Sequence, residues 1–407
     1  MHILLIHQIF VTPEEGGGTR HYELAKYLVK KGHKVTVIAS QVDYLTGKKK
    51  DKKKENKEGI EIIYSHAYKK LHKSFFYRAL SFLSFSISSF LAAKKIKNVD
   101  VILGTSPPLF QSFTTLLISK IRRKPFVFEV RDLWIDFAEE LGIVKNRHII
   151  KFVKMLEKIL YKSAYKIIVN SPGFVPFIER YVSSDKISLI PNSVITQEFE
   201  IEDHSNSFFR SRYRLDNKFI ALYLGNIGVA NDIDMILRAA ELLKEYVEIV
   251  FVLMGDGIRK EDVRQYIEQN KLLNVLLFDV HPKAEIPKIL ADVDVCIATL
   301  KDIPMFKTTY PNKVFDYMAA HKPTILGIDG VIREVIEHAD GGTYIGPGNS
   351  SGLKEAILKY YKNPELKGIH GRNARDYVKK HFERETIANE LEKVLISVIG
   401  NNLEIQK

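Results

Sequence analysis

Short apolar runs alternate along this chain with longer stretches whose apolar residues recur at helical spacing. The run His2–Phe10 predicts a first strand, and Val35–Ala39 predicts a second. Between them, Thr19–Lys31 carries apolar residues at helical spacing and follows the glycine-containing residues 13–18. A strand–helix–strand unit of this length predicts two parallel strands joined by a right-handed crossover.

The same alternation continues through the rest of the chain. Further strands are expected at Val99–Leu103, Phe126–Val130, Lys166–Val169, Phe219–Leu224, Glu248–Met254, Val275–Asp279, Val293–Leu300, Pro323–Ile328 and Thr343–Ile345. Strands that are apolar on both faces and alternate with helices are typical of a doubly wound α/β fold.

The spacing of these elements predicts two Rossmann-like domains that face a central cleft. We expect the first domain over residues 1–195, an irregular polar linker over 196–217, and the second domain over 218–383. A last helix over 384–407 could pack back on the first domain. Because parallel sheets bind ligands outside the carboxyl ends of their strands, the cleft is the expected site.

The charge of the chain is concentrated in two segments. The sequence has 61 Lys and Arg against 49 Asp and Glu, a formal net charge of +12. Residues 48–57 hold seven Lys and two acids, and residues 68–97 hold seven cations and no acid. The remaining positions balance at 47 basic against 47 acidic residues. The protein is therefore neutral apart from two basic segments in its first quarter.

Composition excludes several classes of protein. With 45% hydrophobic and 27% charged residues, the chain is of ordinary globular composition. Its single cysteine, Cys296, excludes a disulfide scaffold and suits a reducing compartment. Met1–Phe10 lacks the basic start of a signal peptide, and the uncharged stretch Ala79–Ala93 is too short to span a bilayer. We expect a cytoplasmic protein that can attach to the inner face of the plasma membrane.

Glycines follow three of the expected strands. Gly16–Gly18 precede a helix, but their spacing is not that of the dinucleotide fingerprint, which disfavours a Rossmann dehydrogenase. Gly225 with Asn226 follows one strand of the second half, and residues 255–257 (Gly-Asp-Gly) follow the next, before a helix that carries Lys260. Such turns either cradle an anion with their amides or are simply tight turns.

The stretch Tyr310–Ala320 (YPNKVFDYMAA) is the sharpest candidate for chemistry. Proline near its start suits the first turn of a helix. Lys313 and Asp316 are three residues apart and share one helix face, so they could hold a diphosphate and a ribose diol. The alternative is a surface ion pair that contributes only tenths of a kcal/mol.

Three further positions near strand ends carry charged residues that could have a function. Arg333, just after Gly330, could pair a phosphate bidentately or simply face solvent. Asp132, in Glu129–Trp134, lies at a strand end that faces the expected cleft, or it caps a helix. The pair Asp292 and Asp294 is better explained as loop residues than as a metal site, and the histidines show no metal-binding spacing.

Taken together, these motifs resemble glycosyltransferase family 4, which has the GT-B fold. The motifs are GGGTRHYELAKYLVKKGHKVTVI (16–38), TSPPLF (105–110), FEVRDLW (128–134), SPGF (171–174), IPNSV (190–194), YLGNIG (223–228), MGDG (254–257) and YPNKVFDYMAAHKPTI (310–325). The resemblance covers nearly the whole chain and is strongest to the amino-sugar transferases of bacterial O-antigen and capsule synthesis, such as N-acetyl-L-fucosamine transferases.

The resemblance implies a retaining transfer from a UDP-sugar to a polyprenyl-diphosphate-linked saccharide, with no required metal or other cofactor. It implies catalytic roles for Asp132 and Lys313 and a ribose-holding role for Asp316. The donor-binding residues that it and the turns suggest are Gly17, Gly18, Gly225, Asn226, Gly255, Asp256, Gly257, Lys260, Asp316, Arg333 and Glu334.

The chain departs from the family pattern at three places. Thr308 stands where the first acid of the family's E-x7-E motif belongs, and Asp316 replaces the second Glu. Asn231 and Asp232 lie in the region where an Arg and Lys pair is common, so other cations must meet the diphosphate. Arg131 stands where many members have a histidine.

The basic segments predict attachment to an anionic membrane. On a helical wheel, the face expected to pack on the domain holds Phe76, Leu80, Leu83, Ile87 and Leu91. The face expected to meet the membrane holds Phe75, Phe82 and Phe85, near Arg78. The alternative is a buried helix with lysine-rich flanks.

Two other functions remain open from the sequence. A sugar-nucleotide epimerase shares the two-domain architecture and would act without an acceptor. A non-enzymatic binder of anionic polymers would also suit basic segments. We expect no nucleic-acid partner, because no such motif is present and the charge is confined to two segments.

Overall fold

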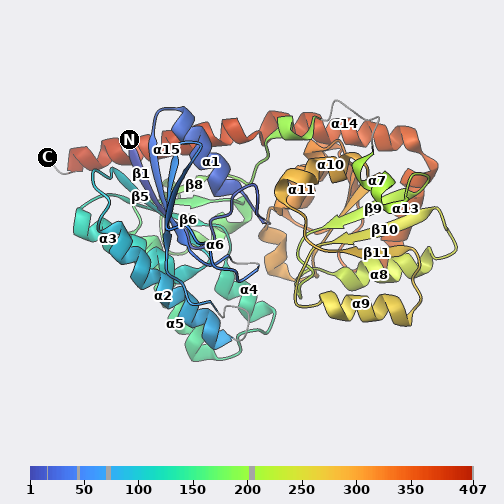
Figure 1. The fold of residues 1–407 in the computed structure, drawn as a ribbon, viewed down its shortest axis with the longest axis horizontal. Coiled ribbons are helices and arrows are strands. Elements are labelled where there is room, and N and C mark those ends of the chain that lie inside the picture. The colour runs from blue at the N-terminus through green and yellow to red at the C-terminus, as the bar shows by residue number, and fades with distance from the viewer. Residues whose placement is uncertain (16, 44–45, 70–74, 201–206, 406–407) are drawn as a thin grey trace. The chain divides into compact units, whose positions relative to one another are not determined.

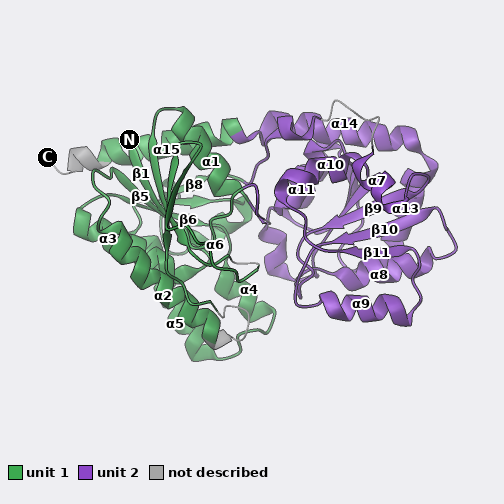
Figure 2. Ribbon diagram, viewed as in Figure 1, with its two compact units in different colours: residues 1–12, 19–191, 385–407 green, residues 13–18, 192–384 purple. Residues whose placement is uncertain are grey.

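The computed structural model describes residues 1–15, 17–43, 46–69, 75–200 and 207–405. The chain forms two compact units. The first unit comprises residues 1–12, 19–191 and 385–407, and the second comprises residues 13–18 and 192–384 (Figure 2).

The first unit is built on an eight-stranded sheet with the order β3-β4-β2-β1-β5-β6-β7-β8. Its strands are β1 (His2–Ile6), β2 (Lys34–Ser40), β3 (Lys54–Lys57), β4 (Ile60–Ser65), β5 (Val101–Ser106), β6 (Phe126–Val130), β7 (Lys166–Val169) and β8 (Ile187–Leu189). All neighbours are parallel except β3, which pairs antiparallel with β4.

Helices cover both faces of this sheet (Figure 1). They are α1 (Arg20–Lys30), α2 (Phe75–Ala93), α3 (Leu109–Arg122), α4 (Trp134–Glu140), α5 (Arg147–Ser163), α6 (Val175–Ile178) and α15 (Arg384–Ile405), with short 3-10 turns at Pro172–Phe174 and Ser184–Lys186. Alternate side chains of β1 point to opposite layers. Ile3 and Leu5 pack with α1 and with α15, whereas Leu4 and Ile6 pack with α2 and α3.

The second unit has a six-stranded parallel sheet with the order β11-β10-β9-β12-β13-β14. Its strands are β9 (Phe219–Leu224), β10 (Ile249–Met254), β11 (Val275–Phe278), β12 (Val295–Thr299), β13 (Thr324–Gly327) and β14 (Gly342–Tyr344). Its helices are α7 (Phe208–Tyr213), α8 (Ile233–Leu242), α9 (Lys260–Gln269), α10 (Ile286–Ala291), α11 (Asn312–Ala319), α12 (Val331–Ala339), α13 (Ser350–Lys362) and α14 (Pro364–His381), with 3-10 turns at Thr196–Phe199, Lys283–Glu285 and Pro304–Thr308.

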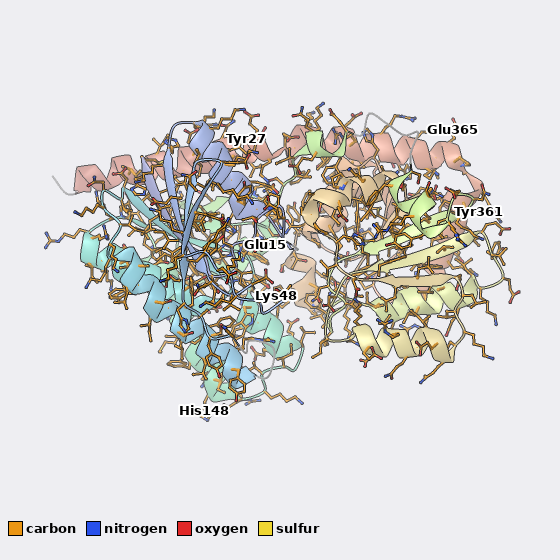
Figure 3. All side chains as sticks on the ribbon, in the orientation of Figure 1. Glu15, Tyr27, Lys48, His148, Tyr361 and Glu365 are labelled. Carbon is orange, nitrogen blue, oxygen red and sulfur yellow. The ribbon has the colours of Figure 1, made fainter. Side chains whose placement is uncertain are left out.

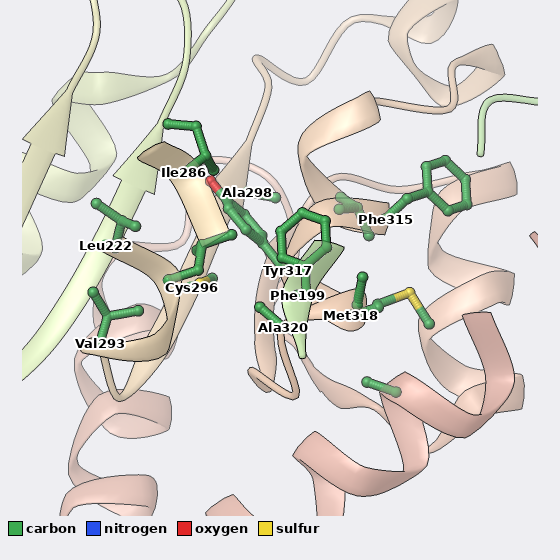
Figure 4. Close-up of a cluster of buried hydrophobic side chains, with 14 of the residues drawn as sticks. Phe199, Leu222, Ile286, Val293, Cys296, Ala298, Phe315, Tyr317, Met318 and Ala320 are labelled. Atoms are coloured by element: carbon green, nitrogen blue, oxygen red, sulfur yellow. The ribbon is translucent and has the colours of Figure 1, made fainter. Parts of the chain in front are cut away.

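The sheet of the second unit is also covered on both faces. Val250 and Val252 of β10 point into the layer that contains α10, α11 and α12, and Phe251 points into the layer that contains α8 and α13. Figure 4 draws part of the first of these cores, with Cys296 and Ala298 of β12 beside Tyr317 of α11. Two doubly wound α/β units with parallel sheets confirm the predicted fold class.

The structure differs from the polar linker expected over 196–217. Phe199, Phe209 and Leu215 are all buried in the core of the second unit. Phe199 lies in the 3-10 turn Thr196–Phe199, Phe209 lies in α7, and Leu215 follows α7; residues 201–206 lie outside the described part. These three apolar residues are separated by polar residues, so a search for continuous apolar runs did not detect them.

The first basic segment also has a structure that its charge concealed. Residues 54–57 form β3, an edge strand, in which Lys54 forms an ion pair with Glu61 of β4. Lysines on an edge strand discourage pairing with other chains. Part of this charge therefore belongs to the protection of a sheet edge.

The predicted orientation of α2 is wrong. Phe85, expected on the membrane side, is fully buried, whereas Leu83, Ile87 and Leu91, expected to pack inward, are exposed. The core side of α2 instead carries serines such as Ser89, which is buried and bonds the carbonyl oxygen of Ser86. Small serine side chains allow α2 to pack closely on the domain. A prediction based on hydrophobicity therefore chose the opposite face of the helix as the buried one.

Other residues of the expected membrane side have mixed outcomes. Phe82 is half-buried and Arg78 is exposed. The side chain of Phe75 lies outside the described residues. Within the described residues, none of the helices combines the length and apolar composition that crossing a bilayer requires.

Candidate active site

Two glycine turns touch at the carboxyl ends of β9 and β10. Gly225 and Gly255 have φ values of 136° and 156°, a region that side chains other than glycine rarely adopt. The amide of Gly225 donates to the carbonyl oxygen of Met254 at 2.9 Å. A Cβ on Gly255 would lie only 1.8 Å from the carbonyl oxygen of Gly225. The two turns therefore lie directly against each other.

Helix α11 brings Lys313 against these turns. The amide of Leu224, at the end of β9, donates to the hydroxyl of Tyr317 at 2.9 Å, which fixes α11 at this strand end. Lys313 lies one helical turn before Tyr317, on the same face. A Cβ on Gly225 would lie 2.9 Å from Lys313 Nζ, so a side chain at this position would require the ammonium group to shift.

Lys313 Nζ is enclosed and has no hydrogen-bond partner among the described residues. It lies 3.9 Å from the ring centroid of Tyr223, within range of a cation–π interaction. Burial lowers the pKa of Lys313 to about 7. The alternative of a surface ion pair between Lys313 and Asp316 is excluded by this geometry. An anion that reached Nζ would favour the charged ammonium.

Asp316, three residues later, has a different partner. Its Oδ2 lies 2.6 Å from Nζ of Lys283, and both side chains are largely buried. Lys283 comes from the 3-10 turn Lys283–Glu285, which precedes α10. A ribose hydroxyl that bound Asp316 would therefore meet a carboxylate already oriented by a lysine.

The other polar groups near the two turns contact the protein itself. Asp256 is exposed, and its Oδ1 accepts a hydrogen bond from the amide of Gly257 at 2.8 Å. Asn226 is also exposed, and its Oδ1 would lie 2.5 Å from a Cβ on Gly257. Lys260, at the start of α9, forms an ion pair with Asp279. Lys260 thus differs from Lys313, because its charge already has a carboxylate partner.

Arg333 also has partners within its own region. Its guanidinium lies 2.7 Å from Glu337 and 3.5 Å from Asp329 and stacks 4.1 Å from the ring centroid of Tyr344. Glu334, the next residue of α12, is exposed.

The turn before α12 is tightly packed. Gly330, with a φ of 86°, has its Cα so near Lys307 that an added Cβ would lie 2.1 Å from the carbonyl oxygen of that residue. Lys307 itself pairs with Asp329 at 3.0 Å. Because Arg333 and Lys307 already have acidic partners, they are weaker candidates for binding a diphosphate.

The glycine loop of residues 13–18 belongs to the second unit by its contacts. A Cβ on Gly18 would lie 3.7 Å from Nδ2 of Asn312, the first residue of α11. Gly17 has a φ of 125°. Gly17 and Gly18 are thus near the helix turn that carries Lys313.

In the first unit, Arg131 and Asp132 directly follow β6. Burial raises the pKa of Asp132 to about 7, although Arg131 and the amide of Leu133 favour its charged form. Arg131 Nη2 lies 3.4 Å from Nε2 of His7 and 3.4 Å from the carbonyl oxygen of Pro107. An aspartic acid with this pKa can exchange a proton near neutral pH.

A buried network behind this pair was missed by the sequence analysis. Glu129 of β6 pairs with Arg20 at 3.1 Å and with His21. Burial alone would raise the pKa of Glu129, but His21 and Arg20 hold it well below its ordinary value. Arg20 also donates to the carbonyl oxygens of Ile190 and Pro191, both at 2.6 Å. The network ties α1 to the far end of the sheet.

Two further ionisable groups near Asp132 were also missed. His7, just after β1, has its ring centroid 4.3 Å from that of His21, and burial lowers its pKa well below the ordinary value. Glu157 of α5 is buried, and burial together with Asp136 raises its pKa to about 8. No local sequence pattern predicts a role for either residue. His7 is a single residue after a strand, and Glu157 is a single position within a helix.

The described residues contain no group of three or more His, Cys, Asp or Glu that could hold a metal ion. Asp292 and Asp294 instead have structural roles. Asp292 accepts from the amide of Phe209 at 2.5 Å, and Asp294 pairs with Arg210 at 2.7 Å. Both residues anchor α7, which gives each carboxylate a structural role.

Two family models match the chain. Residues 15–198 match the model described as Glycosyltransferase Family 4, and residues 218–363 match the model described as Glycosyl transferases group 1. The chain is similar to WcaI of Escherichia coli K12, a protein assigned as a glycosyl transferase of colanic acid biosynthesis. The two are 23% identical over 401 residues, which are 94% of this chain and 97% of WcaI.

Solved structures with the same fold cover nearly the whole chain. Sucrose-phosphate synthase from Thermosynechococcus elongatus has a TM-score of 0.79 at 17% identity, covering 98% of this chain and 99% of its own. Anabaena Alr3699/HepE, solved in complex with UDP-glucose, has a TM-score of 0.73 at 17% identity, covering 98% and 100%. These matches show the GT-B fold in this chain.

Proposed function

We propose that this chain, which belongs to glycosyltransferase family 4 and has the GT-B fold, uses a UDP-sugar to extend a lipid-linked saccharide. The sugar is an N-acetylated amino sugar or a deoxy sugar, and the product is a bacterial surface polysaccharide such as an O-antigen or a capsule. The similarity to WcaI, assigned to colanic acid biosynthesis, supports the pathway class. The UDP-glucose complex of HepE supports a UDP-sugar donor.

The observation that carries the proposal is the enclosed ammonium of Lys313. Departure of UDP from the sugar places negative charge on the diphosphate while the anomeric carbon becomes electron-poor. A preorganised cation near that diphosphate stabilises the developing charge without having to reorganise. Lys313 Nζ is such a group, because no described residue accepts its hydrogen bonds and it lies directly against Gly225, which has no side chain.

The other donor contacts follow from the same turns. In this proposal, the backbone at Gly17, Gly18, Gly225 and Gly255 approaches the diphosphate, since glycine has no side chain to keep it away. The carboxylate of Asp316 accepts hydrogen bonds from the ribose diol. Lys260 and Arg333 have secondary roles, because each already has a carboxylate partner.

The transfer proceeds with retention, and the leaving diphosphate takes the proton of the acceptor hydroxyl. No protein base is then required for the bond-forming step. Asp132, in its carboxylate form, orients the sugar or stabilises positive charge at the anomeric carbon. Its pKa of about 7 makes the fraction of carboxylate sensitive to pH in the neutral range.

The direct test is a panel of UDP- and GDP-sugars incubated with the full chain and a bacterial membrane lipid extract, with the products followed by mass. We expect one UDP-sugar to be transferred to a lipid, and NMR of the product to show the anomeric configuration of the donor. We also expect equal turnover in EDTA and in Mg²⁺, because Lys313 supplies the positive charge. Epimerisation or hydrolysis without any acceptor-dependent product would overturn the proposal.

A further inference from the structure

Helix α5 has a second apolar stripe that faces away from the sheet. Ile150, Leu160 and Tyr161 are buried against the first unit. Ile149, Phe152, Met155 and Ile159 recur at spacings of three and four residues and are 41–55% exposed. Figure 3 marks His148 at the start of this helix. A helix that is apolar on two sides has one apolar side left to cover.

The two helices beside α5 have exposed apolar residues as well. Helix α3 contacts both α2 and α5, and the three cover the same face of the sheet of the first unit (Figure 1). Leu117 and Ile121 of α3 are exposed at a spacing of four residues. Ile87 of α2 is 66% exposed, and Leu83 and Leu91 lie one turn to either side of it. Together these nine residues make an apolar surface, here called the α2–α3–α5 face.

The charge on the α2–α3–α5 face is of one sign. Helices α2 and α3 contain no acidic residue. The only acid of α5 is Glu157, which is buried. The exposed side of α5 carries Lys151, Lys158 and Lys162, and Lys120 lies on α3 next to Ile121. Within the described residues, the exposed charged side chains of the three helices are therefore all cations.

We propose that the α2–α3–α5 face docks the enzyme on an anionic lipid bilayer. Such a surface has negatively charged headgroups above an apolar layer, which matches cations placed beside apolar side chains. A second copy of this chain fits poorly, since a two-fold contact would bring like charges together around the apolar residues. The inference rests on the proposed function only for its lipid-linked acceptor and replaces the face of α2 that the sequence predicted.

Binding of the full chain to vesicles tests the proposal without a donor or an acceptor. We expect the protein to float with phosphatidylcholine vesicles that contain about one third phosphatidylglycerol, and to float poorly with phosphatidylcholine alone. Raising the salt concentration should release it from the anionic vesicles, because exposed charges are screened.

Paired variants assign the binding to this face. Ile149→Ser with Phe152→Ser should lower the partition coefficient at least about tenfold through lost apolar burial. The matched control is Val247→Ser with Leu273→Ser, two residues of the second unit that are 65% and 94% exposed. Lys151→Gln with Lys158→Gln should lower binding roughly tenfold or more, whereas Lys359→Gln with Lys362→Gln on α13 should leave it unchanged.

Several outcomes would overturn the docking proposal while leaving the proposed function intact. Equal binding to neutral and anionic vesicles, or full binding by both α5 variants, would exclude this face. A dimer that dissociates on Phe152→Ser substitution would show that the face binds a second copy. UDP binding, measured by calorimetry on the same variants, reports the donor site separately and should be unchanged in all of them.

Discussion

Buried charge at the strand ends is treated differently in the two units. In the first unit, Glu129 lies between Arg20 and His21, and Arg20 also bonds two backbone carbonyls. In the second unit, the ammonium of Lys313 is enclosed but has no hydrogen-bond partner among the described residues. One charge is paired inside the protein, and the other, in the proposed function, meets the diphosphate of the donor.

Under the proposed function, the first of these charges is structural and the second is functional. A buried carboxylate paired with Arg20 and hydrogen-bonded to His21 keeps the sheet and α1 together, and burial without partners would instead have neutralised it. A buried amine without a carboxylate costs stability, which is reasonable only where a ligand supplies the missing charge. The lowered pKa of Lys313, about 7, is the physical sign of that missing charge.

The outer surfaces of the units differ in a related way. Among the described residues of the second unit, seven large apolar side chains are exposed; six of them lie in connections between helices and strands, and one, Leu242, lies on a helix. In the first unit, nine lie on three adjacent helices. Single exposed residues are ordinary, whereas a shared face marks an interaction surface.

The largest expected effect comes from breaking the paired charge. Glu129→Gln leaves Arg20 buried without its carboxylate and should lower the free energy of unfolding by about 3–5 kcal/mol. Urea unfolding followed by the fluorescence of Trp134, the only tryptophan, reports the first unit. Glu140→Gln, at an exposed position, is the control. A loss below about 1 kcal/mol would show that the pairing is not structural.

The stabilisation by Glu129 also depends on pH in a definite direction. Because the folded pKa lies well below the ordinary value of 4.5, the contribution is present at neutral pH. It is lost as the pH falls below that ordinary value toward the folded pKa. Acid unfolding should therefore be less steep in Glu129→Gln than in the parent protein.

Removing the unpaired charge should lower catalysis without lowering stability. Lys313→Ala should lower turnover about 10²-fold, as expected for the loss of one preorganised stabilising group. Lys313→Met keeps the volume without the charge, so its melting temperature should be unchanged or higher. Lys322→Met, which removes a half-buried lysine that donates to the carbonyl oxygen of Ala291, is the control for turnover. Unchanged kinetics in Lys313→Ala would remove this lysine from the mechanism.

The pH dependence of kcat/KM compares Asp132 with Lys313 in one experiment. Both have a pKa of about 7, but the proposal requires Asp132 deprotonated and Lys313 protonated. Activity should rise as the pH approaches 7 from below and fall above it, giving a bell-shaped profile. Asp132→Asn should lower the maximum about tenfold and remove the acid limb. An acid limb that persists in this variant would assign it to another group, such as Glu157.

The smallest effect is expected where a cation already has acidic partners. Arg333→Ala should raise the KM for the donor less than about threefold, because surface ion pairs contribute little and Glu337 and Asp329 already balance its charge. Arg264→Ala, on the exposed side of α9, serves as the control. A loss comparable to that of Lys313→Ala would mean that Arg333 exchanges its partners when the donor binds.

Much of the fold could be predicted from local pattern. The strands Phe126–Val130, Lys166–Val169 and Phe219–Leu224 have the predicted bounds, because apolar runs between turn residues are local signals. The first strand was predicted too long, since β1 ends at Ile6 and the next residue, His7, turns toward Arg131. The 3-10 turn and helix between residues 196 and 213 were missed, because their buried residues are few and scattered.

The site was predicted less completely than the fold. The two glycine turns and the position of Lys313 follow from strand ends and helix spacing. The partners of each charge do not. Asp316 pairs with Lys283, thirty-three residues away in sequence, and Glu129 pairs with residues more than a hundred positions earlier. Contacts of this kind leave no periodic signal.

The amino-acid sequence by itself determined two α/β halves, glycine turns at successive strand ends, and a lysine on the helix that follows. These features depend on neighbours within a few residues, where backbone geometry and side-chain spacing decide the outcome. Only the tertiary structure decided that Lys313 lacks a partner, that Asp316 has one, and that α2 buries its serines and exposes Leu83, Ile87 and Leu91. Each of those outcomes depends on which distant segments pack together, because burial and charge pairing are properties of the assembled core.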